Sequence, residues 1–284
     1  MPTLLDPTQL PDARELADLR LLAIDLDGTL LGEEMTVDPR FWGLADALMG
    51  RGVQLCAATG RQRGTLVDLF GDRLARMSAI CDNGAYLEHR GRVLHAEVLD
   101  PAVLATIVRG IRELADARHH LAIALTGPDT VVLESPWDDA ALEAARFLHR
   151  ARRVPDVLED AGPTLKVAVF SPARMDGPLL DALHRATPGH RVVQGHDHWV
   201  DVVGADVDKG AALRRLQGVL GIRPAQTAAF GDHLNDIGML RAVGMSFAMA
   251  NGRPDALAAA RFRAPSNTEA GVVQVLGAML DRMG

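Results

Sequence analysis

Two acidic residues stand two positions apart at the end of a short apolar run near the N-terminal end of the chain. Asp25 and Asp27 follow residues 21–24, and Gly28 and Thr29 come directly after them. Two carboxylates that close together repel each other unless a cation lies between them, and Mg²⁺ typically binds one or two carboxylates, waters and a substrate phosphate. The alternative is a pair of solvated turn aspartates that cap a helix. The pattern favours a site for a hard cation.

Two further segments could hold a phosphate group. Thr59, Gly60 and Arg61 follow another apolar run, where a hydroxyl and free backbone N–H groups suit a phosphate oxygen. Lys209 opens a predicted helix, and the positive end of the helix dipole disfavours an ammonium group there unless an anion lies nearby. Without a ligand, Thr59 is a plain helix N-cap and Lys209 an exposed lysine in water. Each segment taken alone leaves both interpretations open.

A fourth segment supplies more carboxylates. Asp232 follows an apolar run, and Asp236 comes four residues later, on one face of the following turn. Gly231 lets the backbone approach a ligand closely. The pattern is typical of a metal site, and capping of a helix is again the alternative.

All four segments depend on a regular alternation of apolar runs and helical patterns. Each run has four to six residues and ends in a polar turn, as in strands buried on both faces. The alternation predicts an α/β fold with a doubly wound, Rossmann-like parallel sheet, in which ligands bind at the carboxyl ends of the strands. The expected strands are 21–24, 53–58, 78–81, 227–230 and 246–250, and the expected helices are 39–50, 62–75, 209–220, 234–242 and 254–261.

The middle of the chain has a different pattern. Hairpins and helices there predict an inserted α+β domain over residues 86–203, so that residues 1–85 and 204–284 together form the core. Its expected strands are 86–89, 92–99, 121–125, 130–133, 165–170, 190–194 and 198–203, and its expected helices are 101–117, 139–151 and 175–186.

Composition and charge exclude several classes of protein. The 284 residues are 48% hydrophobic and 24% charged, as in an ordinary globular protein with a substantial core. The net charge of −7 argues against a general nucleic-acid binder, which needs a basic face. Cys56 and Cys81 form neither a zinc site nor a disulfide framework. No apolar stretch suits a membrane span or a signal peptide, so we expect a cytoplasmic protein, monomeric or homodimeric.

In their order, the four segments resemble the motifs of the haloacid dehalogenase-like hydrolase superfamily, whose phosphatases use an aspartate nucleophile. The matching residues are Asp25-x-Asp27-Gly28-Thr29 for the first motif, Thr59 for the second, Lys209 for the third and Gly231-Asp232-x-x-Asn235-Asp236 for the fourth. The insertion between the second and third motifs resembles a type-two (IIB) cap. Residues 248–252 and 266–272 are similar to the Cof-type branch.

This resemblance implies a role for each matching residue. Asp25 would be the nucleophile that forms an aspartyl-phosphate, and Asp27 the general acid and base. Mg²⁺ would be held by the Asp25 carboxylate, the Asp27 backbone carbonyl and Asp232.

Other residues would surround the phosphate. The resemblance implies that Thr59, Gly60 and Lys209 grip the phosphoryl oxygens and that Asn235 reaches the phosphate. Asp236 would orient Lys209 or a metal-bound water. Arg61 and Asn83, at the ends of predicted strands, are candidates for contact with the substrate or the cap.

The expected activity is Mg²⁺-dependent hydrolysis of a small phosphorylated metabolite, with the inserted domain choosing the substrate. The resemblance implies sugar phosphates or pyridoxal phosphate. The alternatives are a sugar phosphomutase that uses the same nucleophile and a non-catalytic protein that binds a sugar phosphate. The aspartate at position 27 favours rapid turnover to inorganic phosphate, since related ion pumps carry Thr there and hold the phosphoenzyme longer.

Overall fold

The computed structural model describes residues 10–115, 119–146, 148–175 and 177–284, and these form two compact units. Unit 1 consists of Met1–Thr59, Leu69–Leu94 and Asp208–Gly284, and unit 2 consists of Gly60–Asp68 and His95–Val207. Within the described ranges, every helix is too short or too polar to cross a bilayer.

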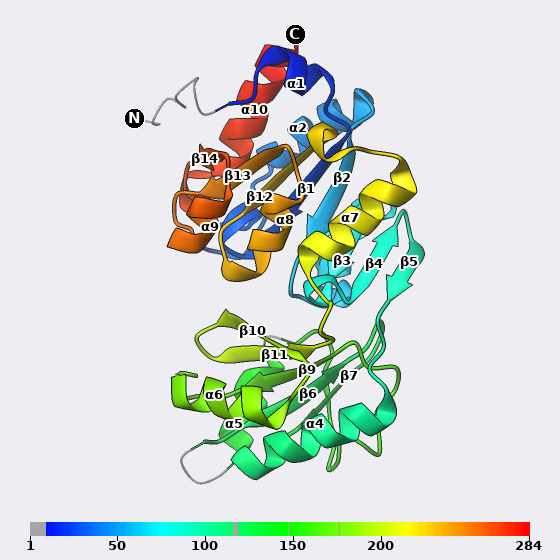
Figure 1. The fold of residues 1–284 in the computed structure, drawn as a ribbon, viewed down its shortest axis with the longest axis vertical. Coiled ribbons are helices and arrows are strands. Elements are labelled where there is room, and N and C mark those ends of the chain that lie inside the picture. Colours follow the sequence, from blue (N-terminus) through cyan, green and yellow to red (C-terminus); the bar gives the residue numbers. More distant parts are fainter. Residues whose placement is uncertain (1–9, 116–118, 147, 176) are drawn as a thin grey trace. The chain divides into compact units, whose positions relative to one another are not determined.

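Unit 1 is built on an eight-stranded sheet in the order β14-β13-β12-β1-β2-β3-β4-β5 (Figure 1). The strands are β1 (Leu21–Asp25), β2 (Gln54–Ala58), β3 (Ser78–Cys81), β4 (Tyr86–His89), β5 (Arg92–Ala96), β12 (Thr227–Gly231), β13 (Met245–Met249) and β14 (Phe262–Ala264). The pairs from β14 to β3 are parallel, and β4 returns antiparallel to β3. The carboxyl ends of β1, β2 and β12 therefore meet at one edge of the sheet.

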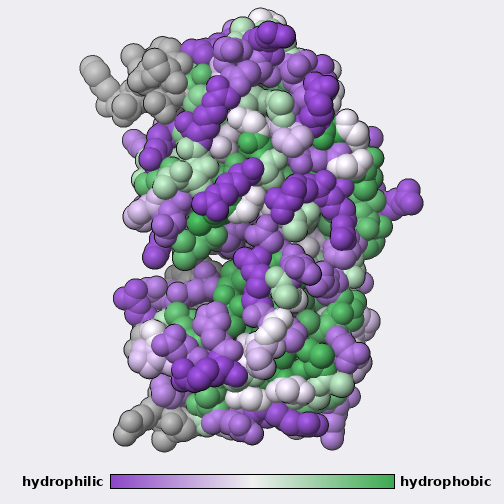
Figure 2. Space-filling view, viewed as in Figure 1, coloured by the Kyte–Doolittle hydropathy of each residue, from purple (hydrophilic) through white to green (hydrophobic). Residues whose placement is uncertain are grey.

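Helices cover both faces of this sheet. On one face, α7 (Lys209–Leu220), α8 (Ile237–Arg241) and α9 (Pro254–Ala259) bury apolar side chains such as Leu213 and Met239 against Leu21 and Ala23 of β1. The remaining helices of unit 1 are α1 (Ala13–Ala17), α2 (Arg40–Gly50) and α10 (Gly271–Met283), and α10 packs on both α1 and α2. Figure 2 shows hydrophilic side chains over α7, whose outer face exposes Arg214 and Arg215.

Unit 2 is a six-stranded sheet in the order β10-β11-β9-β6-β7-β8. The strands are β6 (Ala122–Thr126), β7 (Val131–Glu134), β8 (Arg152–Arg153), β9 (Lys166–Phe170), β10 (Arg191–His196) and β11 (Trp199–Val203). The helices α4 (Pro101–Leu114) and α6 (Gly177–Ala186) pack on one face, and α5 (Asp138–Ala145) packs on the other. The helix α3 (Arg63–Phe70) begins in unit 2 and ends in unit 1.

The predicted α/β class with a parallel-sheet core and a separate α+β unit is confirmed. The borders differ from the expected ones, because β4 and β5 extend the sheet of unit 1 and residues 60–68 group with unit 2. Leu87 of β4 is fully buried in the core of unit 1 and pairs with Ile80. The predicted helix 62–75 ends at Phe70 because Gly71 has a φ of 53° and starts a 3-10 turn.

Candidate active site

Asp25 is the last residue of β1 and lies where the central strands of unit 1 end. All five residues of β1 are buried, since β2 and β12 flank the strand and helices cover the sheet. The side chain of Asp25 is therefore almost inaccessible, with 4% of the residue exposed. Beyond it the chain leaves the sheet through a tight turn, residues 26–30, in which Gly28 has a φ of 74°.

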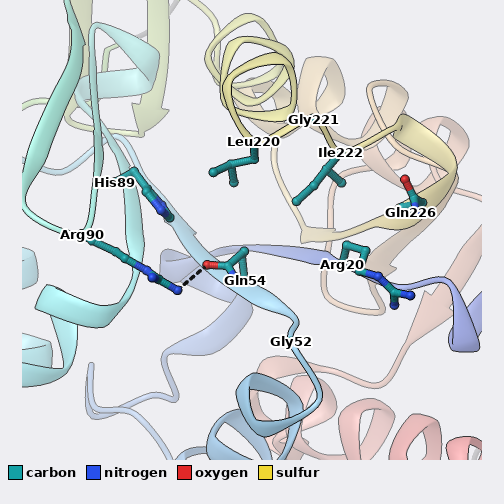
Figure 3. Close-up of a pocket in the computed structure, with 9 residues that line it drawn as sticks. All are labelled: Arg20, Gly52, Gln54, His89, Arg90, Leu220, Gly221, Ile222 and Gln226. Atoms are coloured by element: carbon teal, nitrogen blue, oxygen red, sulfur yellow. Dashed lines mark hydrogen bonds between the residues drawn. The ribbon is translucent and has the colours of Figure 1, made fainter.

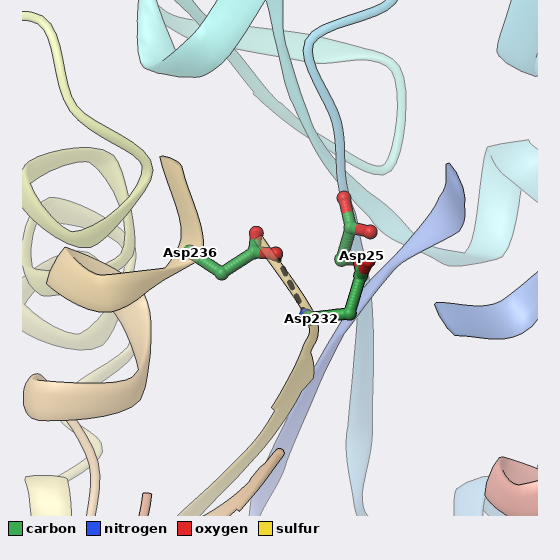
Figure 4. A group of neighbouring side chains, drawn as sticks. All are labelled: Asp25, Asp232 and Asp236. Carbon is green, nitrogen blue, oxygen red and sulfur yellow. Dashed lines mark hydrogen bonds between the residues drawn. The ribbon is translucent and has the colours of Figure 1, made fainter. Parts of the chain in front are cut away.

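Three carboxylates meet at this edge of the sheet. One oxygen each from Asp25, Asp232 and Asp236 lies within 4.8 Å of the others. Figure 4 shows Asp232 directly after β12 and Asp236 in the turn that follows, with the side chains of both directed toward Asp25. Oδ2 of Asp236 accepts the backbone N–H groups of Asp232 and His233, each at 3.0 Å. Oxygen donors of this kind suit a hard divalent cation.

Lys209 pairs with two of these carboxylates. Its Nζ lies 2.6 Å from Oδ1 of Asp25 and 2.7 Å from Oδ1 of Asp236. The lysine opens α7, and Asp208 caps the helix by accepting the N–H of Ala211 at 3.0 Å. Only 1% of Lys209 is exposed, so the alternative of a lysine in water is wrong.

The charges in this site are not balanced by the protein alone. Burial raises the pKa of Asp25 well above its ordinary value, and repulsion from Asp236 adds to this effect, while Lys209 opposes it. Burial and Asp236 together raise the pKa of Asp232 to about 6. Burial lowers the pKa of Lys209, but the two neighbouring carboxylates outweigh burial and raise it above its ordinary value. A cation at the carboxylates would relieve the repulsion that remains.

The turn after β1 packs directly against Asp232. The hydroxyl of Thr29 donates to Oδ1 of Asp232 at 3.0 Å. A Cβ atom at Gly28 would lie 2.4 Å from Oδ2 of the same carboxylate, so only glycine fits there.

Two asparagines hold this turn from the C-terminal part of the chain. Nδ2 of Asn251 donates to the carbonyl of Gly28 at 2.8 Å, and Oδ1 of Asn251 accepts the N–H of Asn267 at 3.0 Å. Nδ2 of Asn267 donates to the carbonyl of Leu31 at 2.9 Å. In the sequence, both asparagines stand out only as part of a family resemblance, which assigns them no role.

Thr59, Asn83 and Asn235 lie in the same unit as the carboxylates. Thr59 follows β2 and is fully buried, and its carbonyl accepts the N–H of Asn83 at 3.1 Å. Oδ1 of Asn83 accepts from Nδ2 of Asn235 at 3.0 Å. Oδ1 of Asn235 is buried and has no hydrogen-bond partner among the described residues. An unpaired acceptor of this kind is available to a donor on a bound molecule.

The structure does not bring every predicted residue into this cluster. The side chain of Asp27 is exposed and is not one of the three carboxylates that lie together. Gly60 and Arg61 group with unit 2. There the carbonyl of Gly60 accepts from Nζ of Lys166 at 2.6 Å, and this buried lysine also pairs with Asp201 at 3.0 Å. In the sequence, Lys166 could have been identified as a charged residue at the start of the otherwise apolar strand β9.

Comparison with known proteins gives consistent matches over most of the chain. The family model described as haloacid dehalogenase-like hydrolase matches residues 22–276. The 5-amino-6-(5-phospho-D-ribitylamino)uracil phosphatase YbjI of Escherichia coli (strain K12) is 30% identical over 268 residues, which cover 92% of this chain and 96% of that protein. The pyridoxal phosphate phosphatase YbhA of the same organism is 27% identical over 269 residues, which cover 90% and 97%.

A solved structure extends the match to the architecture. The HAD subclass IIB sugar phosphatase BT4131 superposes with a TM-score of 0.78 at 19% identity, covering 91% of this chain and 98% of that one. The parallel-sheet core and the separate α+β unit are therefore shared with a protein of known fold.

Proposed function

We propose a specific reaction for this chain, which belongs to the haloacid dehalogenase-like hydrolase family and is a phosphoric monoester hydrolase. In this proposal it hydrolyses small phosphorylated metabolites, sugar phosphates foremost. The reaction uses Mg²⁺ and passes through an aspartyl-phosphate on Asp25. The observation that carries the proposal is the buried group of Asp25, Asp232 and Asp236 around the ammonium of Lys209.

Asp25 is the nucleophile in this proposal. A carboxylate oxygen of Asp25 attacks phosphorus, the new P–O bond forms, and the P–O bond to the leaving alkoxide breaks. Its pairing with Lys209 at 2.6 Å holds the carboxylate in one orientation and favours its ionised form. Water then attacks the phosphorus of the aspartyl-phosphate, which releases phosphate and restores the carboxylate.

Asp27 supplies the proton to the leaving alkoxide and then accepts a proton from the attacking water. Its side chain is exposed, in contrast to that of Asp25, and can thus exchange protons with solvent and substrate. The two aspartates accordingly have different surroundings, as their two roles require.

The carboxylates Asp25 and Asp232 would bind Mg²⁺, together with the Asp27 carbonyl. These residues suit Mg²⁺ because their hard carboxylate oxygens lie within 4.8 Å of one another and repel each other without a cation. When bound, Mg²⁺ neutralises charge on the phosphoryl oxygens. Asp236 accepts from Lys209 and from the backbone beside Asp232, so we assign it the orientation of both residues.

The phosphoryl oxygens need further donors. In the proposal they receive hydrogen bonds from Lys209, Thr59, the Gly60 amide and the second N–H of the Asn235 amide, with Arg61 and Asn83 near the substrate. Unit 2 serves as the cap that selects the substrate. Named relatives act on a phosphoribitylamino-uracil, on pyridoxal phosphate and on sugar phosphates, all small phosphorylated molecules.

Phosphate release from a panel of hexose phosphates, pentose phosphates and pyridoxal phosphate tests the proposal. We expect the wild type to release phosphate with Mg²⁺ and to release none with EDTA. The Asp25→Asn variant should release no phosphate. Asp72→Asn, which changes an exposed aspartate of unit 1, should keep full activity. Acid-quenched enzyme should carry a hydroxylamine-sensitive phosphate on the peptide that contains residue 25. Bisphosphate-stimulated isomerisation without phosphate release would establish the mutase instead, and activity in Asp25→Asn would refute the nucleophile.

A further inference from the structure

A cavity lies within unit 1, at the opposite ends of the strands that carry the aspartates. It has a volume of about 500 Å³. Arg20 and Gln226 come directly before β1 and β12, and Gln54 begins β2. Figure 3 shows these residues with His89 and Arg90 from the end of β4. The cavity and the three carboxylates therefore lie at opposite edges of the same parallel strands.

The charge of this cavity is positive. The charge comes from Arg20 and Arg90, which line the cavity together with His89 and the amides Gln54 and Gln226, and none of the described lining residues is acidic. The whole chain has 37 acidic against 30 basic residues. A concave site with two arginines and no carboxylate among its described lining residues has a positive potential, which favours an anionic ligand.

Neither arginine is neutralised by a carboxylate in the part of the chain that the structure describes. Nη1 of Arg20 donates to the carbonyls of Ala17 and Leu19, at 3.0 and 2.7 Å, which fixes the guanidinium in place. Nη2 of Arg90 donates to Oε1 of Gln54 at 3.0 Å. A guanidinium has five N–H donors in a planar fork, so each keeps donors for the oxygens of a phosphate.

His89 contributes a polar ring to this lining and, with a lowered pKa, no charge at neutral pH. Its Nδ1 is 2.8 Å from the hydroxyl of Ser78. Burial lowers the pKa of His89, and the positive charge of Arg90 lowers it further.

The end of α7 also borders the cavity, and helix carbonyls would repel an anion. Two of these carbonyls are occupied, because the N–H of Ile222 donates to Gln217 at 2.9 Å and the N–H of Gly221 donates to Gly218. Leu220 and Ile222 present apolar side chains to the cavity instead. Figure 3 shows Arg90 and Arg20 toward opposite ends of the lining, with the apolar side chains of Leu220 and Ile222 between them.

We propose that this cavity is a second binding site, separate from the aspartates, for a small phosphorylated metabolite whose phosphate oxygens contact Arg20 and Arg90. The apolar wall at Leu220 and Ile222 receives the carbon skeleton of the ligand. Three elements connect this site with the candidate active site: β1 runs from Arg20 to Asp25, β12 from Gln226 to Asp232, and α7 from Lys209 to Leu220. A ligand in the cavity therefore contacts the far ends of the elements that hold the catalytic residues.

Calorimetric titration with inorganic pyrophosphate tests the site on the intact chain. EDTA is present throughout, so that no metal-assisted binding or hydrolysis occurs at the aspartates. We expect binding by the wild type and an affinity at least about tenfold weaker in the double variant Arg20→Gln/Arg90→Gln, since a charged hydrogen bond contributes about 1.5–3 kcal/mol. Arg92→Gln, an exposed arginine outside the cavity, should bind like the wild type.

Arginine footprinting gives a readout that does not depend on variants. Pyrophosphate should protect Arg20 and Arg90 of the wild type from a dicarbonyl reagent, as measured by peptide mass spectrometry, and leave Arg92 unprotected. The proposal is overturned if the wild type does not bind pyrophosphate, if the double variant binds it as tightly, or if protection falls elsewhere. Such a result would not bear on the proposed hydrolase activity, because the cavity and the candidate active site share no residue.

Discussion

The ammonium nitrogen of Lys209 lies 2.6 Å from a carboxylate oxygen of Asp25, although 184 positions separate the two residues in the sequence. Both groups are almost completely buried, and Asp236 shares the same ammonium. A buried ion pair of this kind adds little net stability, because desolvation offsets most of the attraction, but removal of one partner leaves a buried charge uncompensated. The lysine therefore controls both the stability of unit 1 and the orientation of the proposed nucleophile.

Replacement of Lys209 by Met should lower both the stability of the chain and its catalytic rate. Loss of the ammonium leaves Asp25 and Asp236 without their counter-charge, and we expect a loss of about 3–5 kcal/mol in the free energy of unfolding. Loss of a phosphate-binding cation should lower kcat at least about a hundredfold. Urea unfolding and steady-state kinetics measure the two effects.

An exposed residue on the same helix provides the control for this variant. Arg215→Ala should leave both quantities close to the wild-type values. The stability deficit of Lys209→Met should also shrink as the pH falls toward 4, because the carboxylates then take up protons. A deficit that is independent of pH would show that lost packing, and not uncompensated charge, is the cause.

The raised pKa of Asp232, about 6, predicts how stability depends on pH without a metal. Between pH 4 and 6 the folded chain keeps a proton that the unfolded chain releases, so the free energy of unfolding falls as the pH rises through this range. A pKa change of one corresponds to about 1.4 kcal/mol, and we expect this carboxyl to contribute a loss on the order of 2 kcal/mol.

Urea unfolding in EDTA, compared between the wild type and Asp232→Asn, isolates the contribution of this carboxyl. The stability of the wild type relative to the variant should decrease from pH 4 to pH 6.5. Added Mg²⁺ should reverse the decrease for the wild type only, since a cation takes the place of the lost protons. Parallel pH curves for the two proteins would contradict the assigned pKa.

Asn251 should position the turn that follows the nucleophile. Replacement by Ala removes the donor to the Gly28 carbonyl and the acceptor for the Asn267 N–H. Since Asn251 is exposed, packing changes little, and we expect a stability loss of only about 1 kcal/mol. The expected functional effect is a kcat about tenfold lower and a higher Mg²⁺ concentration for half-maximal rate, with the substrate KM unchanged.

Gln274→Ala is the matched control for the Asn251 variant. Gln274 also makes a side-chain hydrogen bond in the C-terminal part of the chain, to the carbonyl of Glu269 at 2.7 Å, and this bond does not involve residues 26–31. Its kinetics should match the wild type. An Asn251→Ala enzyme with normal kcat and normal Mg²⁺ dependence would show that the turn holds its shape without the asparagine.

The sequence could predict the edge of the sheet at which the site lies, because each polar segment follows an apolar run and parallel strands end at one edge. It could not predict that Asp25 and Asp27 differ in exposure. Two positions apart on one strand they would lie on the same face, but β1 ends at Asp25 and the turn with Gly28 at a φ of 74° carries Asp27 outward.

Different causes explain why the sequence pattern did not predict β8 and β14 on the one hand and α10 on the other. β8 has two residues and β14 has three, too few for a hydrophobic period to show. The helix α10 does carry a helical signal, since Val272, Val275, Leu276 and Met279 are buried at the spacing of one helix face. The motif-like residues 266–272 overlap the start of this helix.

Gly28 and Gly32 offer a test of the close packing between the turn and Asp232. A methyl group at Gly28 would lie 2.4 Å from Oδ2 of Asp232, and the φ of 74° is unfavourable for alanine. We expect Gly28→Ala to displace the Asp232 carboxylate, to weaken Mg²⁺ binding at least about tenfold and to lower the free energy of unfolding by about 1–3 kcal/mol. A methyl group at Gly32 would have no described atom within 4 Å, and the φ of Gly32 is ordinary, so Gly32→Ala should be close to neutral. The melting temperatures of the two variants, measured with and without Mg²⁺, test this expectation. An equal Mg²⁺-induced increase in melting temperature for both variants would show that the close packing at Gly28 is not needed for Mg²⁺ binding.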